Sequence, residues 1–144
     1  MDETTDFGDG FLTPTPIYAR PIMEMFEAGV DIHALQPITG HGWSKIARFK
    51  ADYTYNIKDV PKPPLIFQKA IEWGGSMGAD VRPEENYFVW NMGVGFVVIA
   101  PQEYESAIIA CSRRHGLDTY RLGGVKKGDR KVVMEPFGFA YNPR

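Results

Sequence analysis

The chain has 144 residues, with 16 Lys and Arg against 18 Asp and Glu, and a formal net charge of −2. This length accommodates one domain with a hydrophobic core and is too short for two ordinary domains. The near-neutral charge argues against a dedicated nucleic-acid binder, because such proteins carry an excess of basic residues. The longest apolar run, Val94 to Ala100, has seven residues, whereas about 20 are needed to span a bilayer. We therefore expect a soluble domain that binds neither nucleic acid nor membrane.

The first ten residues contain four acidic side chains and no basic one. The sequence therefore predicts an acidic linker stub over residues 1–10 and a single domain over residues 11–144. A secretory signal, which needs a basic and then an apolar stretch, is not visible at this end. The lone Cys111 cannot form an internal disulfide, which fits a reducing compartment. Together these features predict a cytoplasmic location.

The first predicted helix begins at Thr15, whose side chain can cap it, and Pro16, which suits the first helical position. Pro21 interrupts this helix and predicts a kink or a restart, and Gly29 is the predicted stop. The expected buried stripe consists of four apolar residues: Ile17, Ile22, Met25 and Phe26. A short helix is predicted over Trp43 to Phe49.

The middle of the chain predicts one strand and one helix. Tyr53 to Ile57 alternates apolar and polar residues, which is the period of a half-buried strand. The connector Asp59 to Pro64 contains three prolines and leads into a helix that ends at Gly74-Gly75. One face of that helix carries four residues: Leu65, Ile66, Ala70 and Trp73.

The last third predicts strands on either side of a helix. Tyr87 to Trp90 and Val94 to Ile99 are predicted strands. Gln102 to His115 is the clearest helix, because acidic residues lie in its first turn and basic residues in its last. Thr119 to Val125 and Lys131 to Glu135 are predicted to pair as a hairpin. Strands and helices that do not strictly alternate predict an α+β fold, with helices covering a mostly antiparallel mixed sheet.

The first candidate ligand site is the run Ile38-Thr39-Gly40-His41-Gly42. Its glycines allow the backbone to approach a ligand and turn N–H groups toward an anion, and Thr39 adds a hydroxyl. The run lacks the Gly-Lys-Ser/Thr ending of a Walker phosphate loop. A purely structural turn remains the alternative.

The second candidate is the run Asn91-Met92-Gly93-Val94-Gly95. It contains a Gly-x-Gly but lacks the third glycine of a dinucleotide fingerprint and its strand–turn–helix order. A bulged strand in the core is the alternative interpretation.

The sequence gives little support for a metal site, a catalytic nucleophile or a basic binding patch. The three histidines have no metal-ligand spacing, so we predict no metal site, and no serine or cysteine nucleophile has a recognisable partner. No catalytic residue is therefore named. The basic cluster lies on the predicted hairpin turn, where a solvated loop is favoured over a phosphate or nucleic-acid patch. Its members are Lys126, Lys127, Arg130 and Lys131.

Several segments in order resemble the C-terminal domain of aminoimidazole ribonucleotide (AIR) synthetase, the phosphoribosylformylglycinamidine cyclo-ligase of purine synthesis. The matching segments, in chain order, are Leu12 to Tyr18, Asp31 to Leu35, Ile38 to Gly42, Phe88 to Phe96 and Arg130 to Pro136. The resemblance covers almost the whole chain from about residue 10, and it implies the fold of that C-terminal domain.

The resemblance also implies a function. In that family ATP, with Mg²⁺, activates the formyl-derived amide oxygen of a phosphoribosylated substrate, and an internal nitrogen then closes the imidazole ring. An N-terminal domain holds most of the nucleotide-binding residues, and the intact enzyme is expected to be a homodimer. This chain would supply the half that faces the substrate and its phosphate, and alone it would be inactive. The residues carried over are Thr39, Gly40, Gly42, Asn91, Gly93 and Gly95, with His41 carried over by position only.

Two departures from the family pattern keep alternatives open. The usual turn is His-x-Thr-Gly-Gly-Gly, whereas Pro37 stands at the histidine position and His41 replaces a glycine. The family's Arg-Thr-Phe-Asn is Phe88-Val89-Trp90-Asn91 here, so an arginine is missing. The alternatives are a compensated variant in which His41 reaches the same ligand, a non-catalytic ligand-binding or scaffold module, and half of another ATP-dependent kinase or synthase of the superfamily.

Overall fold

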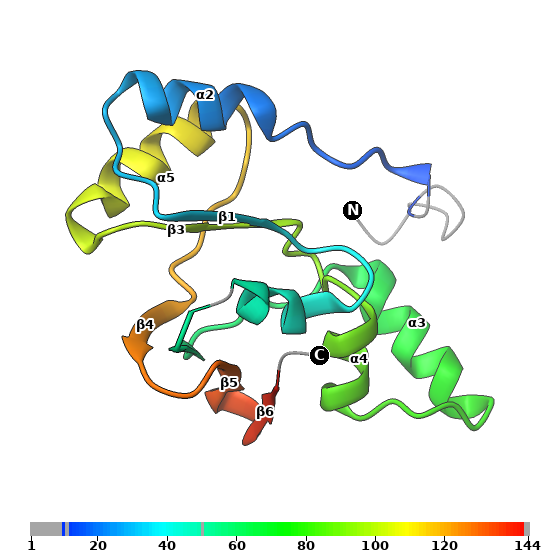
Figure 1. Cartoon of the computed structure of the whole chain (residues 1–144). Helices are drawn as coiled ribbons and strands as arrows, with labels where there is room; N and C mark the ends of the chain where they lie inside the picture. Colours follow the sequence, from blue (N-terminus) through cyan, green and yellow to red (C-terminus); the bar gives the residue numbers. More distant parts are fainter. Residues whose placement is uncertain (1–9, 11, 50, 143–144) are drawn as a thin grey trace.

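The computed structural model describes residue 10, residues 12–49 and residues 51–142 (Figure 1). The predicted linker stub therefore lies outside the described residues, apart from Gly10. The helices are α2 (Ala19–Glu27), α3 (Leu65–Ser76), α4 (Pro83–Val89) and α5 (Glu105–Arg114), with 3₁₀ segments η1 (Gly42–Arg48), η2 (Gln102–Tyr104) and η3 (Glu135–Phe137). The strands are β1 (Ala34–Pro37), β2 (Tyr53–Ile57), β3 (Phe96–Ile99), β4 (Gly123–Lys127), β5 (Lys131–Met134) and β6 (Phe139–Tyr141).

These strands form two separate sheets, where the sequence predicts one. Strand β1 pairs antiparallel with β3, which places Leu35 opposite Val98. The second sheet has the order β4-β2-β5-β6, in which β2 and β5 are parallel and the other neighbours antiparallel. The predicted α+β class and mostly antiparallel pairing are thus confirmed, and the expectation of a single sheet is wrong.

The predicted hairpin between residues 119–125 and 131–135 is also wrong. Strand β2 lies between β4 and β5, so that Tyr55 is opposite Val125 on one side and Val132 on the other. Tyr55 is buried, whereas β4 is exposed along most of its length. The apolar alternation of β2 therefore makes it a central strand, and the lysine-bearing β4 forms the edge, where charged residues discourage further pairing.

The predicted strand over Tyr87 to Trp90 is wrong because α4 extends from Pro83 to Val89. Proline occupies the first helical position and two glutamates lie in the first turn, and both features favour a helix start. Tyr87 is buried and meets the edge of Trp43, with ring centroids 5.5 Å apart. Aromatic residues that are typical of strands therefore pack into the core from a helix.

The first helix starts later than predicted. Helix α2 begins at Ala19, and Pro21 lies in its first turn, where the missing N–H is not needed, so the helix continues to Glu27. Half of the predicted stripe is buried. Ile22 and Met25 are in the core, whereas Ile17 is 80% exposed and Phe26 is 49% exposed.

The remaining predicted elements are found close to their expected positions. The short helix after Gly42 is the 3₁₀ segment η1, and the helix after the proline connector is α3. Helix α3 has no buried residue, and Trp73 on it is 49% exposed. The helix predicted over Gln102 to His115 is the pair η2 and α5. Strand β3 begins at Phe96, two residues later than predicted.

The β1–β3 sheet lies between two hydrophobic clusters (Figure 1). Alternate residues of β3 face opposite sides, because side chains alternate along a strand. Phe96 and Val98 pack with α2 and α5 around Met25. Val97 and Ile99 pack on the larger cluster, which joins η1, α4 and the four-stranded sheet. The sheet therefore connects both layers, and the turn after β1 emerges beside η1 and α4.

Candidate functional site

The two candidate runs meet in the structure. The N–H of Ile38 donates to the carbonyl of Gly95 at 2.9 Å, which continues the β1–β3 pairing into both runs. The indole N–H of Trp43 donates to the carbonyl of Asn91 at 3.0 Å. Trp43 is completely buried, so this bond is shielded from water. The Thr39–Gly42 turn and the Asn91–Gly95 segment are therefore fixed against each other.

Gly42 fixes the turn against α4. Its N–H donates to the carbonyl of Thr39 at 2.8 Å, which closes the turn. Its φ is +47°, and an added Cβ would lie 2.0 Å from the carbonyl oxygen of Tyr87 and 2.7 Å from that of Phe88. This glycine is required by packing of backbone on backbone.

His41 lies on the outside of the turn. It has a φ of +69° and is exposed. Its ring meets that of Phe88 edge-on, with centroids 5.8 Å apart, and its carbonyl accepts a hydrogen bond from the Ser44 hydroxyl at 2.6 Å. His41 and Phe88, which both depart from the family pattern, are thus in contact with each other.

Other residues of the chain fill the space next to the two glycines of the second run. The N–H of Gly93 donates to the Asn91 side-chain oxygen at 2.9 Å, and Cβ at Gly93 would lie 2.4 Å from Cδ of Pro64. Cβ at Gly95 would lie 2.0 Å from the hydroxyl of Tyr18. Burial raises the pKa of this tyrosine. Packing and a φ of +91° together require glycine at position 93, whereas at position 95 the atom met is the movable hydroxyl end of Tyr18. The role of both glycines toward a ligand stays a prediction.

The predicted site residues do not share one cavity. Gly93 and Gly95 line a groove of about 850 Å³ between the β1–β3 sheet and the β2–β4 edge, together with Tyr18 and Pro64. Neither the Thr39–Gly42 turn nor Asn91 belongs to that lining. The turn therefore presents a surface of its own, beside the groove.

One residue of the turn's surroundings was missed by the sequence reasoning. Lys45 on η1 is only 9% exposed, and its ammonium donates a hydrogen bond to the hydroxyl of Thr39. Trp43 and Ile46, its neighbours on the same short helix, are buried as well. The available signal was the position of Lys45 within an otherwise apolar helical stripe, where a lysine is unusual.

A family described as "AIR synthase related protein, C-terminal domain" matches residues 1–135. The phosphoribosylformylglycinamidine cyclo-ligase of Methanothermobacter thermautotrophicus is 42% identical over 133 residues, which are 92% of this chain and 36% of that protein. The protein of the same name from Methanobrevibacter smithii is 37% identical over 133 residues, or 92% of this chain and 37% of that protein. The chain belongs to the AIR synthase related family.

The fold agrees with a solved structure of low sequence identity. The crystal structure of tt0281 from Thermus thermophilus gives a TM-score of 0.51 at 19% identity, covering 78% of this chain and 34% of that one. This AIR synthase related chain spans just over a third of the length of the curated relatives named above. It matches the C-terminal domain of its family.

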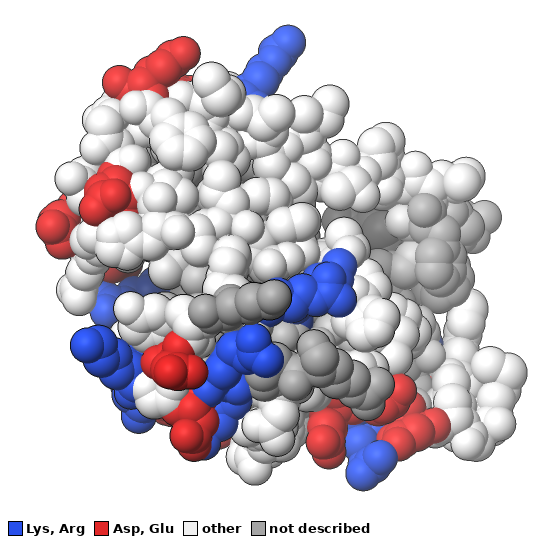
Figure 2. Space-filling model, in the orientation of Figure 1, with Lys and Arg blue, Asp and Glu red and all other residues white. Residues whose placement is uncertain are grey.

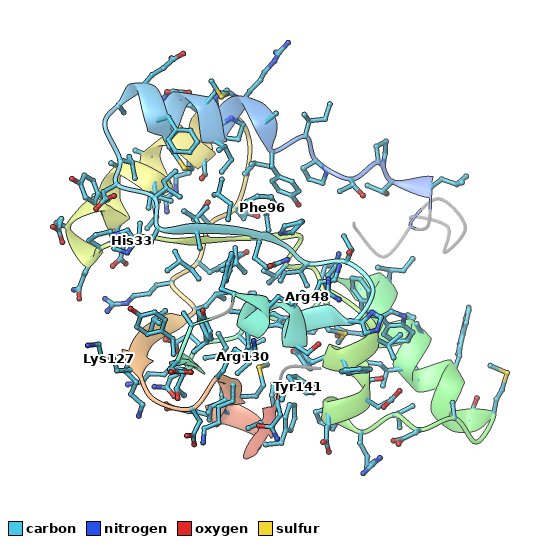
Figure 3. All side chains as sticks on the ribbon, viewed as in Figure 1. His33, Arg48, Phe96, Lys127, Arg130 and Tyr141 are labelled. Atoms are coloured by element: carbon cyan, nitrogen blue, oxygen red, sulfur yellow. The ribbon has the colours of Figure 1, made fainter. Side chains whose placement is uncertain are left out.

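The basic cluster of this family member lies on a mixed-charge face. Lys126 and Lys127 are exposed on the edge strand β4, and Lys131 pairs with Asp129 at 3.1 Å. Figure 2 shows blue and red side chains intermingled over the region of β4 and β5. In Figure 3, Lys127 points outward from β4. This arrangement favours the predicted solvated surface.

A group of potential metal ligands joins α2 to α5. Glu24, Cys111 and His115 place one ligand atom each within 4.8 Å of one another. The Glu24 carboxylate accepts a hydrogen bond from Arg114 and is hydrogen-bonded to the ring of His115 at 2.6 Å. These two hydrogen bonds hold the pKa of Glu24 below its usual range. Burial raises the pKa of the Cys111 thiol. Glu24 therefore links α2 to α5 through its contacts with Arg114 and His115, and the sequence prediction of no metal site stays a prediction.

In the described part of the chain, every helix is too short or too polar to cross a membrane.

Proposed function

We propose that this chain is the C-terminal part of a phosphoribosylformylglycinamidine cyclo-ligase and works with an ATP-binding N-terminal part. The observation that supports this most strongly is the 42% identity, over 92% of the chain, to a relative of that name. The chain spans only 36% of that relative, so the remaining part of the reaction machinery would come from elsewhere. A homodimeric enzyme and a cytoplasmic location belong to the same proposal.

In this proposal the Thr39–Gly42 turn faces the phosphate of the substrate. It offers a threonine hydroxyl and the ammonium of Lys45, which donates to that hydroxyl. Donors and a cation suit phosphate oxygens, whereas Mg²⁺ requires oxygen ligands such as carboxylates. Among the described residues no carboxylate pairs with Lys45. In the same proposal ATP and its Mg²⁺ are held mainly by the N-terminal part, where ATP supplies the activation of the amide oxygen.

The proposal is tested by titrating the ¹⁵N-labelled chain with the part of the M. thermautotrophicus relative that this chain does not cover, with and without a phosphorylated ribonucleotide. We expect association, with amide shifts near Thr39 and Asn91 when the nucleotide is added. The same addition to a Lys127→Ala variant serves as control and should give the same shifts. Lack of association, together with unchanged amides at both positions, would refute the proposal.

A non-catalytic module of the same fold is the second candidate. Its support is the set of departures at Pro37, His41 and Phe88, where the family pattern has a histidine, a glycine and an arginine. The contact between His41 and Phe88 places two of these departures side by side at the turn. Complementation of a purine auxotroph by the gene that encodes this chain, expressed with the N-terminal part, distinguishes the two candidates. Growth rejects the non-catalytic module, and failure despite expression supports it.

Another ATP-dependent kinase or synthase of the superfamily would also fit the fold. The reconstituted pair distinguishes it, because ADP release would then follow a different acceptor. ADP release that requires formylglycinamidine ribonucleotide supports ring closure.

A further inference from the structure

The most unusual polar group in the molecule is the ammonium of Lys45. The residue is nine-tenths buried. Within residues 12–49 and 51–142 it forms no ion pair, and its one hydrogen-bond partner is the Thr39 hydroxyl. A buried charge is costly unless an opposite charge compensates it. The described residues leave this cation without such a partner.

The exposed Thr39 hydroxyl connects the buried ammonium of Lys45 to the protein surface. Its oxygen accepts from Lys45, so its own proton is free to be donated away from the lysine, and a hydroxyl polarised in this way is a stronger donor. Thr39 and Gly40 are both exposed. An added Cβ at Gly40 would meet nothing within 4 Å, so the outer side of the turn is open. The described hydrogen bonds also leave the N–H groups of Gly40 and His41 unused.

We propose that Lys45 and Thr39, with the backbone N–H groups of Gly40 and His41, bind the phosphate of a phosphate monoester. The assignment of Lys45 rests on the proposed function, in which this turn faces a phosphorylated substrate. A phosphate monoester offers three oxygens and about two negative charges. It therefore matches a cation with several donors better than a carboxylate, which offers two oxygens and one charge.

Thermal unfolding of the chain measures this site directly, because a ligand that binds only the folded state raises the midpoint with its concentration. The probes are inorganic phosphate, ribose 5-phosphate and AMP, each against sodium chloride at equal ionic strength. The variants are Lys45→Met, Thr39→Val and, as control, Lys127→Met on the exposed edge strand. A response to all three phosphates identifies the phosphate group itself as the ligand. A response confined to ribose 5-phosphate and AMP shows that the sugar is also required.

We expect the phosphates to raise the midpoint of the wild type and of Lys127→Met equally. Lys45→Met should weaken the apparent affinity at least about tenfold, and Thr39→Val by a smaller factor, as expected for charged and neutral hydrogen bonds. Without phosphate, Lys45→Met should unfold at the wild-type temperature or higher, because an uncompensated buried charge has been removed. A purely structural lysine predicts a lower midpoint instead, with the phosphate response unchanged.

The proposal is overturned if the wild type responds to phosphates no more than to chloride, or if Lys45→Met keeps the full response. Should Lys45→Met fail to fold, Thr39→Val decides, because an unchanged response in that variant also overturns the proposal. Association with the N-terminal part is measured separately. A chain that associates normally but ignores phosphates therefore rejects the role of Lys45 and leaves the proposed function standing.

Discussion

Gly42→Ala tests how the candidate turn is held against α4. An added Cβ would lie 2.0 Å from the carbonyl oxygen of Tyr87 and 2.7 Å from that of Phe88. Real Cβ atoms essentially never come within 3.0 Å of a non-bonded heavy atom outside their own and the adjoining residues. Both obstructing atoms belong to the backbone of a helix, so they cannot rotate away as a flexible side chain does. The variant must therefore displace either the turn or the end of α4.

The expected cost combines two effects. A left-handed backbone costs a residue other than glycine roughly 1–2 kcal/mol, and Gly42 has a φ of +47°. Forcing atoms into a packed region costs about 1–3 kcal/mol more. The free energy of unfolding should thus fall by about 2–5 kcal/mol, out of a typical total of about 5–15 kcal/mol. At roughly 3–4 °C per kcal/mol for a chain of this size, the thermal midpoint should fall by about 6–20 °C.

Gly40→Ala is the matched control. Gly40 belongs to the same turn, its φ is not left-handed, and an added Cβ would meet nothing within 4 Å. Urea unfolding followed by tryptophan fluorescence measures both variants, since buried Trp43 lies directly after the turn. If the two variants unfold within about 0.5 kcal/mol of each other, the turn is not packed on α4 as described.

Three further predictions concern single contacts. Gly93→Ala should lower the free energy of unfolding by about 1–3 kcal/mol more than Gly29→Ala does. Both glycines have a positive φ, but only at Gly93 would the added Cβ collide with a proline ring. Equal urea midpoints for the two variants would contradict this. Hydrogen bonds from Arg82 lower the pKa of Asp80 from 3.8 to about 2. The stabilisation that the ionised Asp80 gives the folded state should therefore be present above pH 4 and be lost as the pH falls through about 2. Asp80→Asn should remove that part of the acid dependence, and an NMR titration midpoint near 4 would refute it. Tyr18→Phe should partly rescue Gly95→Ala in a double-mutant cycle, because the tyrosine hydroxyl is the atom closest to the added Cβ; independent effects would show that the two do not collide.

Local signals in the sequence predicted several elements correctly. The alternation of Tyr53 to Ile57 lies within β2, and the charge gradient along Gln102 to His115 lies within the adjoining η2 and α5. Which strands are neighbours in a sheet could not be predicted from such local signals. The insertion of β2 between β4 and β5 depends on contacts between distant segments, and the short loop between those two strands favours a hairpin on local grounds alone. The strand prediction within residues 83–90 was wrong for another reason. It relied on the aromatic residues there and disregarded the helix-start signal of Pro83 and the two glutamates that follow it.

The candidate site was predictable in its location but not in its composition. The Gly-rich runs marked both segments, and the structure joins them through Ile38 and Trp43. The only sequence signal for Lys45 was its position within an otherwise apolar helical stripe, and its partner Thr39 is identified only by the fold. The resemblance to the family also gave no indication of this lysine, because the matching motif ends at Gly42.

The glycines of the two runs are needed for different reasons, and this difference narrows the candidate site. Gly42 is required by the backbone of α4 and Gly93 by Pro64, and an added Cβ at Gly95 would meet the hydroxyl of Tyr18. Each of these three has an explanation within the chain. Gly40 has none, because an added Cβ would meet open space and no left-handed φ demands glycine there. The space beside Gly40, next to the exposed Thr39 hydroxyl, is therefore the part of the turn that the proposed phosphate site would use. In the proposed function, the surface that faces the substrate is centred on Thr39 and Gly40, and the second run supports it.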